Sequence, residues 1–298
     1  MATVSALLNK FCDRVLINRE ASYVGSSTPA ARQYVSLLEF ICSELLKRGD
    51  WITLKRVYTF TTQTGVSNYQ NPGDFWRPLR GTQYSVNNQM PLAGPISNGE
   101  MALQTYGITA SGPYAKFQFN GAQGYVFNTS PYSQTSAGYF QISPAGTNNT
   151  DQNVIAYISK NTVWPTNWLA STGYLAGVKV TGINNIYICT TAGTSGTTRP
   201  SVLTGTVVDG TVTWTVYNET YPISADTDIC LFDDELVVEG MRWAYWRAKK
   251  QDYGQEKSDW DDSVKVGLGR QNGAILVNAA GMDSAELPNV PDGSWSVS

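Results

Sequence analysis

Three consecutive carboxylates, Asp233, Asp234 and Glu235, are the residues of this 298-residue chain with the clearest potential for chemistry. Two carboxyl groups held close together can act as general acid and general base, as they do in glycoside hydrolysis. A second acidic group contains Asp259, Asp261 and Asp262. For both groups we favour a structural role, because Asp is a preferred N-cap residue, acidic side chains stabilise the first turn of a helix, and charged residues line solvated helix faces.

Residue types that are missing exclude further chemistry. The chain contains no histidine, which removes Ser–His and Cys–His nucleophile pairs and the most frequent zinc ligand. The cysteines at positions 12, 42, 189 and 230 form no CxxC pair, and the N-terminus lacks the pattern of a secretory signal, so we expect buried thiols. No Gly-rich loop precedes a Lys-Ser/Thr pair. The sequence therefore predicts no catalytic residue, no metal and no cofactor.

The first acidic group lies in the segment that organises the chain, a predicted helix within residues 226–253. Asp226, Asp228 and Asp233 are its candidate N-caps, and no proline interrupts it. Its apolar residues do not keep to one stripe, so it needs neighbours on more than one side. The helix is either the centre of one domain or shared between a domain core and a subunit interface.

Further helices are predicted from apolar periodicity over residues 4–19, 28–48, 98–106 and 255–270. The second is the most clearly bounded, with Thr28 as N-cap, Pro29 in the first turn and Gly49 as the stop. Asn98 is the expected N-cap of the third.

Alternating patterns predict short strands between these helices. They cover Thr53–Thr62, Ala115–Asn120, Gly124–Phe127, Tyr139–Ser143 and Asn153–Ser159. Residues 161–222 differ in composition, with 15 threonines and 4 charged residues, and include the hairpin signal Asp209-Gly210. Their own set of strands and turns indicates an inserted module.

The expected fold class is α+β. A helical bundle would comprise residues 1–56 and 225–270, and an antiparallel β domain residues 57–164. Residues 165–222 would form the inserted small all-β module, and residues 271–298, which contain no Lys or Arg, an extended C-terminal arm.

Charge and hydropathy limit the partners. The net charge is −3, so bulk electrostatics predict no strong attraction to nucleic acid or to an anionic membrane, and no apolar run approaches the length of a membrane span. Four basic residues interleaved with aromatics, Lys55, Arg56, Arg77 and Arg80, are candidates for phosphate contact or for ion pairs between subunits.

The aromatic residues of the inserted module are Trp168, Tyr174, Tyr187 and Trp214. Aromatic faces can stack on sugar rings, which makes a glycan-binding surface one interpretation. In a module of about 50 residues such side chains more often form the core, because little else is large enough to fill it. We favour the core interpretation.

Four stretches together resemble the head-to-tail adaptor (connector) proteins of tailed bacteriophages, especially short-tailed ones. They are ARQYVSLLEFICSELLKRGDW (residues 31–51), DFWRPLRGTQYSVNNQMPLAGPIS (74–97), IAYISKNTVW (155–164) and ADTDICLFDDELVVEGMRWAYWRAKKQDYGQE (225–256). Separately, WLASTGYLAGVKV, IYICTTAGTSGTTRP and DGTVTWTVY resemble small β-modules of phage tail and fibre proteins. The shortest members of the adaptor family lack such an insert.

The resemblance implies a structural protein of the virion neck, assembled in the host cytoplasm. It implies a ring, commonly of twelve copies, that binds beneath the portal and above the tail nozzle. DNA would pass through the lumen without sequence recognition, and no membrane would be involved. The inserted module would meet a fibre, a collar or a host glycan.

Within this interpretation we expect Met241, Trp243, Tyr245 and Trp246 at the packed helix interface between subunits. The portal-docking residues are expected in the arm, at Ile275, Leu276 and Val277. Two alternatives remain. One is a receptor-binding tail protein that acts through the inserted module, and the other is a wall-degrading tail enzyme that uses a carboxylate pair.

Overall fold

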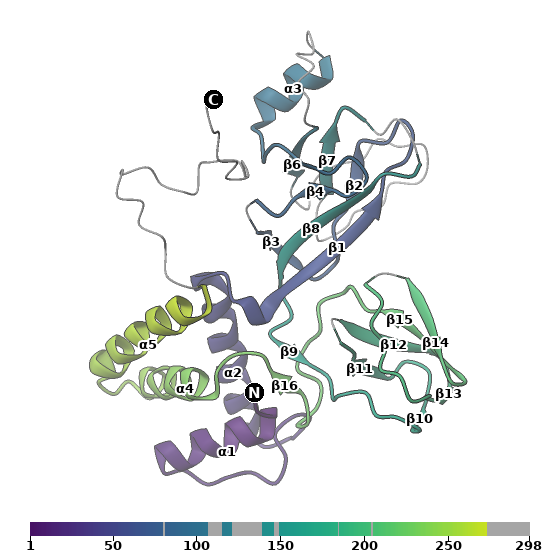
Figure 1. Ribbon diagram of the computed structural model, residues 1–298. Helices are drawn as coiled ribbons and strands as arrows, with labels where there is room; N and C mark the ends of the chain where they lie inside the picture. The colour runs from purple at the N-terminus through teal and green to yellow at the C-terminus, as the bar shows by residue number, and fades with distance from the viewer. Residues whose placement is uncertain are drawn as a thin grey trace, which may run out of the picture. The chain divides into compact units, whose positions relative to one another are not determined.

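The computed structural model describes residues 1–79, 81–106, 115–120, 139–145, 149–183, 185–203 and 205–272 (Figure 1). Helices and antiparallel sheets are both present, so the α+β class is confirmed at that level. The chain divides into two compact units. The first contains the described parts of residues 1–56, 72–77 and 157–272, and the second contains the described parts of residues 57–71 and 78–156.

Helix α4 (Asp234–Ala248) is the central helix of the first unit. It contacts α1 (Val4–Val15), α2 (Pro29–Arg48) and α5 (Gly254–Asn272), as Figure 1 shows. The apolar circumference expected from the sequence is therefore covered by helices of the same chain. Both alternatives for this helix require such a core within the chain, and a contact of α4 with a neighbouring subunit stays a prediction.

A glycine allows this close packing. Gly240 lies in the middle of α4, and a Cβ atom there would lie 2.7 Å from Ile41 of α2 and 2.8 Å from the indole nitrogen of Trp260 of α5. The indole nitrogen of Trp260 donates to the Leu236 carbonyl at 2.9 Å, which ties α5 to the first turn of α4. Glycine destabilises a helix interior intrinsically, so its place here is explained by the contacts that it permits.

The helix termini match the sequence in part. Thr28 caps α2 by accepting from the Ala31 amide, as expected, but Gly49 ends it in an extended conformation rather than in the left-handed one. Asp233 is the N-cap of α4 and accepts from the amides of Glu235 and Leu236. The helix therefore begins later than the segment from residue 226 suggested.

The earlier aspartates of that segment hold turns instead. Asp226 accepts hydrogen bonds from the Tyr23 and Val24 amides and from the Ser22 hydroxyl. Asp228 is buried and accepts from Tyr221 and from the backbone near Ser224.

The first unit also contains small antiparallel sheets. Strand β9 (Val163–Trp164) pairs with β16 (Ile229–Cys230), and β10 (Gly173–Tyr174) pairs with β13 (Gly193–Thr194). A four-stranded sheet has the order β11-β12-β15-β14. Its strands are β11 (Lys179–Thr181), β12 (Ile186–Thr191), β14 (Thr206–Asp209) and β15 (Val212–Val216).

The hairpin signal in this sheet is confirmed. Asp209 pairs with Val212 across a two-residue turn, in which Gly210 has φ of 67°. This left-handed conformation favours glycine. The sheet has a hydrophobic core of its own, made by Trp168, Val180, Tyr187, Cys189, Val212, Trp214 and Val216.

The second unit has a three-stranded sheet in the order β2-β7-β6, made by β2 (Asn68–Gln70), β6 (Lys116–Asn120) and β7 (Tyr139–Ser143). Aromatic rings dominate its core, which comprises Phe60, Tyr69, Leu92, Phe117, Phe140, Ile142 and Ile155. The predicted strand at residues 124–127 lies outside the described residues.

A five-stranded sheet has the order β1-β8-β4-β5, with β3 also pairing with β8. Its strands are β1 (Lys55–Thr61), which follows a 3₁₀ turn at Ile52–Leu54, β3 (Phe75–Pro78), β4 (Tyr84–Ser85), β5 (Met90–Pro91) and β8 (Gln152–Ser159). The chain passes between the two units within β1, β3 and β8 and between residues 71 and 72.

Helix α3 (Asn98–Tyr106) occupies the predicted residues but begins with a different cap. Ser97 accepts from the Glu100 amide, and the Glu100 carboxylate accepts from the Ser97 amide at 3.0 Å. This is a capping box, so Ser97 rather than Asn98 caps the helix.

Candidate functional site

The first acidic group is used for helix capping and ion pairing. Asp233 caps α4, and Asp234 accepts from the Ala2 amide at 3.0 Å. Glu235 pairs with Lys10 and Arg14 of α1. These two cations lower the pKa of Glu235, the Lys10 hydrogen bond most strongly. A general acid needs a raised pKa, so the environment of Glu235 is the opposite of what acid catalysis requires.

The second acidic group is divided among separate ion pairs. Asp261 pairs with Arg48 of α2 and with Lys257, while Asp262 pairs with Lys265. Burial tends to raise the pKa of Asp261, but the Lys257 and Arg48 partners outweigh it and lower that pKa. Asp259 accepts from the Gln255 side chain.

Members of both acidic groups nevertheless meet in one groove between α4 and α5, of about 550 Å³. Trp51, Leu236, Val266 and Gly267 give it an apolar lining. Its carboxylates are Asp233, Glu235, Glu239, Asp259 and Asp262, against Arg270 as its cation. This combination of apolar lining and negative rim is suited to a cationic side chain with an apolar stem.

The four residues expected at the subunit interface differ in exposure. Met241, Trp243 and Tyr245 are 0%, 3% and 8% exposed, because α1, α2 and α5 already cover those faces of α4. They have almost no surface for a neighbouring subunit in this conformation and are core residues of the chain. Trp246 is half-buried and retains surface for such a contact. Its place at a subunit interface therefore stays a prediction.

The module aromatics are mainly core residues, as the sequence favoured. Tyr187 and Trp214 are fully buried and Trp168 is 9% exposed. Both indole nitrogens donate to the Asp209 carboxylate, at 2.9 Å for Trp168 and 3.2 Å for Trp214. These three rings present no open face on which a sugar could stack. Tyr174 is half-buried and packs edge-on against Trp214.

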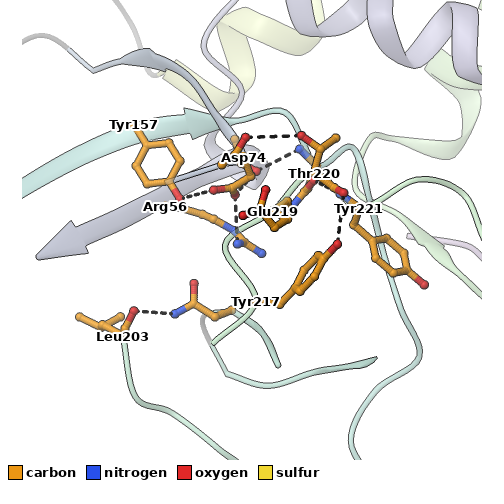
Figure 2. A network of polar contacts seen from close by, with 12 residues as sticks. Arg56, Asp74, Tyr157, Leu203, Tyr217, Glu219, Thr220 and Tyr221 are labelled. Carbon is orange, nitrogen blue, oxygen red and sulfur yellow. Dashed lines mark hydrogen bonds and ion pairs between the residues drawn. The ribbon is translucent and has the colours of Figure 1, made fainter. Parts of the chain in front are cut away.

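A buried polar network in the first unit was not found by sequence reasoning (Figure 2). Asp74 has no exposed surface and accepts from the Tyr157 hydroxyl at 2.8 Å, the Ser159 hydroxyl at 2.6 Å and the Arg56 guanidinium at 3.1 Å. Its main chain is also tied, since its carbonyl accepts from Lys160 and its amide donates to Asn218. The network joins β1, β8 and the turn before β3 at one point.

Arg56 is enclosed as tightly as its partner. The side chains of Arg56 and Asp74 are 1% and 0% exposed, and the guanidinium carbon lies 5.0 Å from the centre of the Trp164 ring. The Nε and Nη2 groups of Arg56 have no hydrogen-bond partner among the described residues. The pair is therefore a structural ion pair inside the chain, and Arg56 is unavailable to a phosphate or a neighbouring subunit.

Burial and Asp74 also fix the state of Tyr157. Burial, followed by the nearby Asp74 charge, raises the pKa of Tyr157 far above its usual range. Tyr157 therefore remains a hydroxyl donor to the carboxylate wherever the chain is folded.

The remaining site predictions have mixed outcomes. All four cysteines are buried and free, as expected. Arg77 pairs with Asp50 within the chain, while Arg80 and the portal-docking residues 275–277 lie outside the described residues. Within the ranges that the structure describes, no three His, Cys, Asp or Glu side chains are placed to hold one metal ion, and no helix is long and apolar enough to cross a membrane.

No protein-family model matches the sequence, and no curated protein matches it significantly.

Proposed function

We infer that the chain is a structural adaptor that assembles as a ring, commonly of twelve copies, between the portal and the tail nozzle of a bacteriophage. In this proposal residues 1–56 and 225–270 form the ring-building helical bundle, and residues 57–164 face the tail. The inserted module (165–222) projects toward a fibre or collar, and the arm (271–298) reaches the portal. DNA passes through the lumen without being read.

The observation that carries the proposal is that the four stretches that resemble the adaptor family contact one another. Residues 31–51 meet residues 225–256 through the Trp51 and Phe232 rings, whose centres are 5.4 Å apart. Residues 74–97 meet residues 155–164 where Asp74 accepts from Tyr157 and Ser159.

Two further contacts close the set. Arg77 donates to Asp50 at 2.6 Å, and β9 pairs with β16. Four unrelated local similarities would not be expected to lie in contact with one another. Four stretches that form one common core would be in contact, because core side chains pack closely against one another.

The state of the polar clusters supports a role without catalysis. Asp233 caps a helix, and Asp259 accepts from an amide side chain. Glu235, Asp261 and Asp262 pair with cations. Cation partners lower the pKa values of Glu235 and Asp261, which does not suit the general acid of the wall-degrading alternative, and the glycan-binding alternative retains only Tyr174 as a partly open ring.

The test is the mass of the purified chain by light scattering, alone and then mixed with the portal protein encoded in the same genome. The proposal expects a portal-sized complex that contains a fixed multiple of the 32.6 kDa chain. A chain that stays monomeric with and without the portal would remove the ring interpretation. Turnover of purified peptidoglycan by the chain would instead favour the enzyme.

A further inference from the structure

Helices α4 and α5 form a hairpin (Figure 1), and two surfaces of opposite charge lie on it. One is the acidic groove, which is lined by the first half of α4 and by residues 259–271 of α5. The other lies where α4 passes into α5, and we name it the cationic turn. It consists of Arg247, Lys249 and Lys250, all exposed, with Trp246 half-buried beside them.

Interaction with the helix dipoles explains only some of the charged residues on these two surfaces. Asp233 and Glu235 suit the positive end of the α4 dipole, and Arg247 suits its negative end. Glu239 and Asp259 lie beyond the first turns of α4 and α5, where the dipole has no effect on them. Glu239 forms no ion pair with any residue in the described part of the chain.

The cationic turn is likewise only weakly compensated. Arg242, one turn earlier, is neutralised by Glu256, and the Lys249 ammonium lies 5.3 Å from the centre of the Tyr245 ring. Asp252 is the one acidic residue within residues 247–253, and it accepts from the Gly254 amide. The turn keeps a net positive charge, and the groove keeps a net negative charge even after its pairs with Lys10, Arg14 and Lys265.

We propose that the acidic groove of one copy binds the cationic turn of a second copy of this chain. Lys249 and Lys250 would lie against Glu239 and Asp259, and Trp246 would extend the contact toward the apolar lining of the groove. The lining includes Val266, which is 52% exposed although it is aliphatic. The proposal rests on the ring function and names the surface through which neighbouring copies meet.

Charge selects a second copy over the chain's own C-terminal residues as the occupant. Residues 271–298 directly follow the groove, but they contain Asp283, Glu286 and Asp292 and no cation. Like charges brought together oppose binding, whereas the cationic turn is complementary. The two surfaces are different parts of the chain, so the contact is head-to-tail, and a head-to-tail contact produces a ring when its rotation closes.

The test uses two charge-reversed variants of the full chain. The first, E239K/D259K, reverses the groove, and the second, K249E/K250E, reverses the turn. We expect the association constant of each variant alone to fall by about tenfold or more, because like charges then face each other at every contact. Mixed in equal amounts, the two variants should assemble again, because alternate copies then present matching charges at both contacts.

Assembly is measured as mass by light scattering, alone and on the portal ring, with circular dichroism to check folding. The matched control for K249E/K250E is R32E/K47E, which makes the same change in net charge on the exposed face of α2 and should assemble like the original chain. If the original chain assembles and the variants do so equally, or if their mixture does not recover, the proposed contact is wrong while the ring function stands. If the original chain never assembles, both are wrong.

Discussion

Replacing Asp74 by asparagine is the most direct test of how the first unit is held together. The substitution keeps the shape of the side chain and removes its charge. Arg56 would then be a buried cation with no counter-charge, and the new amide group would direct a donor toward the donors of Arg56, Tyr157 or Ser159.

The size of the effect follows from burial. Both charged side chains are essentially unexposed, and breaking a buried ion pair by removing one partner costs about 3–5 kcal/mol. For a unit of 150–250 residues each kcal/mol lowers the melting temperature by about 2–4 °C, so we expect a loss of roughly 10 °C. Removing one hydrogen bond to the carboxylate, with Ser159→Ala, should cost less, about 1.5–3 kcal/mol.

Urea unfolding followed by tryptophan fluorescence measures these losses. A double variant, Arg56→Met with Asp74→Leu, should recover part of the stability, because no unpaired charge is then buried, while the Tyr157 and Ser159 hydroxyls lose their acceptor. Such replacement is favoured here by the Nε and Nη2 nitrogens of Arg56, which lack hydrogen-bond partners among the described residues. A cost below about 1 kcal/mol for Asp74→Asn would refute the reasoning, since it would mean that the pair is not desolvated.

Three further predictions concern stability. Thr28→Ala removes the N-cap of α2 and should cost about 1 kcal/mol in urea unfolding, whereas Thr28→Ser should not. Trp214→Ala empties the centre of the four-stranded sheet, and its cost of about 3–5 kcal/mol should appear as faster proteolysis within residues 165–222. Burial is the main cause that raises the pKa values of Tyr23 and Tyr187 to about 12 each. Unfolded tyrosine ionises near pH 10, so their contribution to stability is complete below about pH 10 and is lost as the pH rises toward 12. Melting temperatures against pH, with tyrosine absorbance, check the window, and unchanged stability up to pH 12 would contradict it.

Local signals were sufficient for much of the secondary structure. Helix α2 combines an N-cap threonine, a proline in its first turn and a long apolar stripe. Strand β7 covers the residues of an alternating run that turn residues bound. The cap of α3 was misassigned although the sequence contains the answer. Ser97 and Glu100 have the spacing of a capping box, which is a stronger signal than an isolated Asn98.

Long-range partners were the part that the sequence did not reveal. Asp226, Asp228 and Asp233 look alike as N-cap candidates, but the first accepts from residues about 200 positions away and only the third caps α4. Arg56 looked like a surface cation because its partner, 18 residues away, lies in the turn before β3. No periodicity or spacing encodes such a pairing.

The low charge content of the chain makes its remaining charged surfaces informative. Charged residues are 15% of the sequence, against about 25% in an ordinary globular domain. In a highly charged protein, five carboxylates around one groove would be unremarkable surface composition. Here charge is sparse, and capping or ion pairing already accounts for Asp233 and Glu235, but neither accounts for Glu239. A groove that keeps such a residue beside an exposed Val266 is explained better by a complementary surface than by the stability of the single chain.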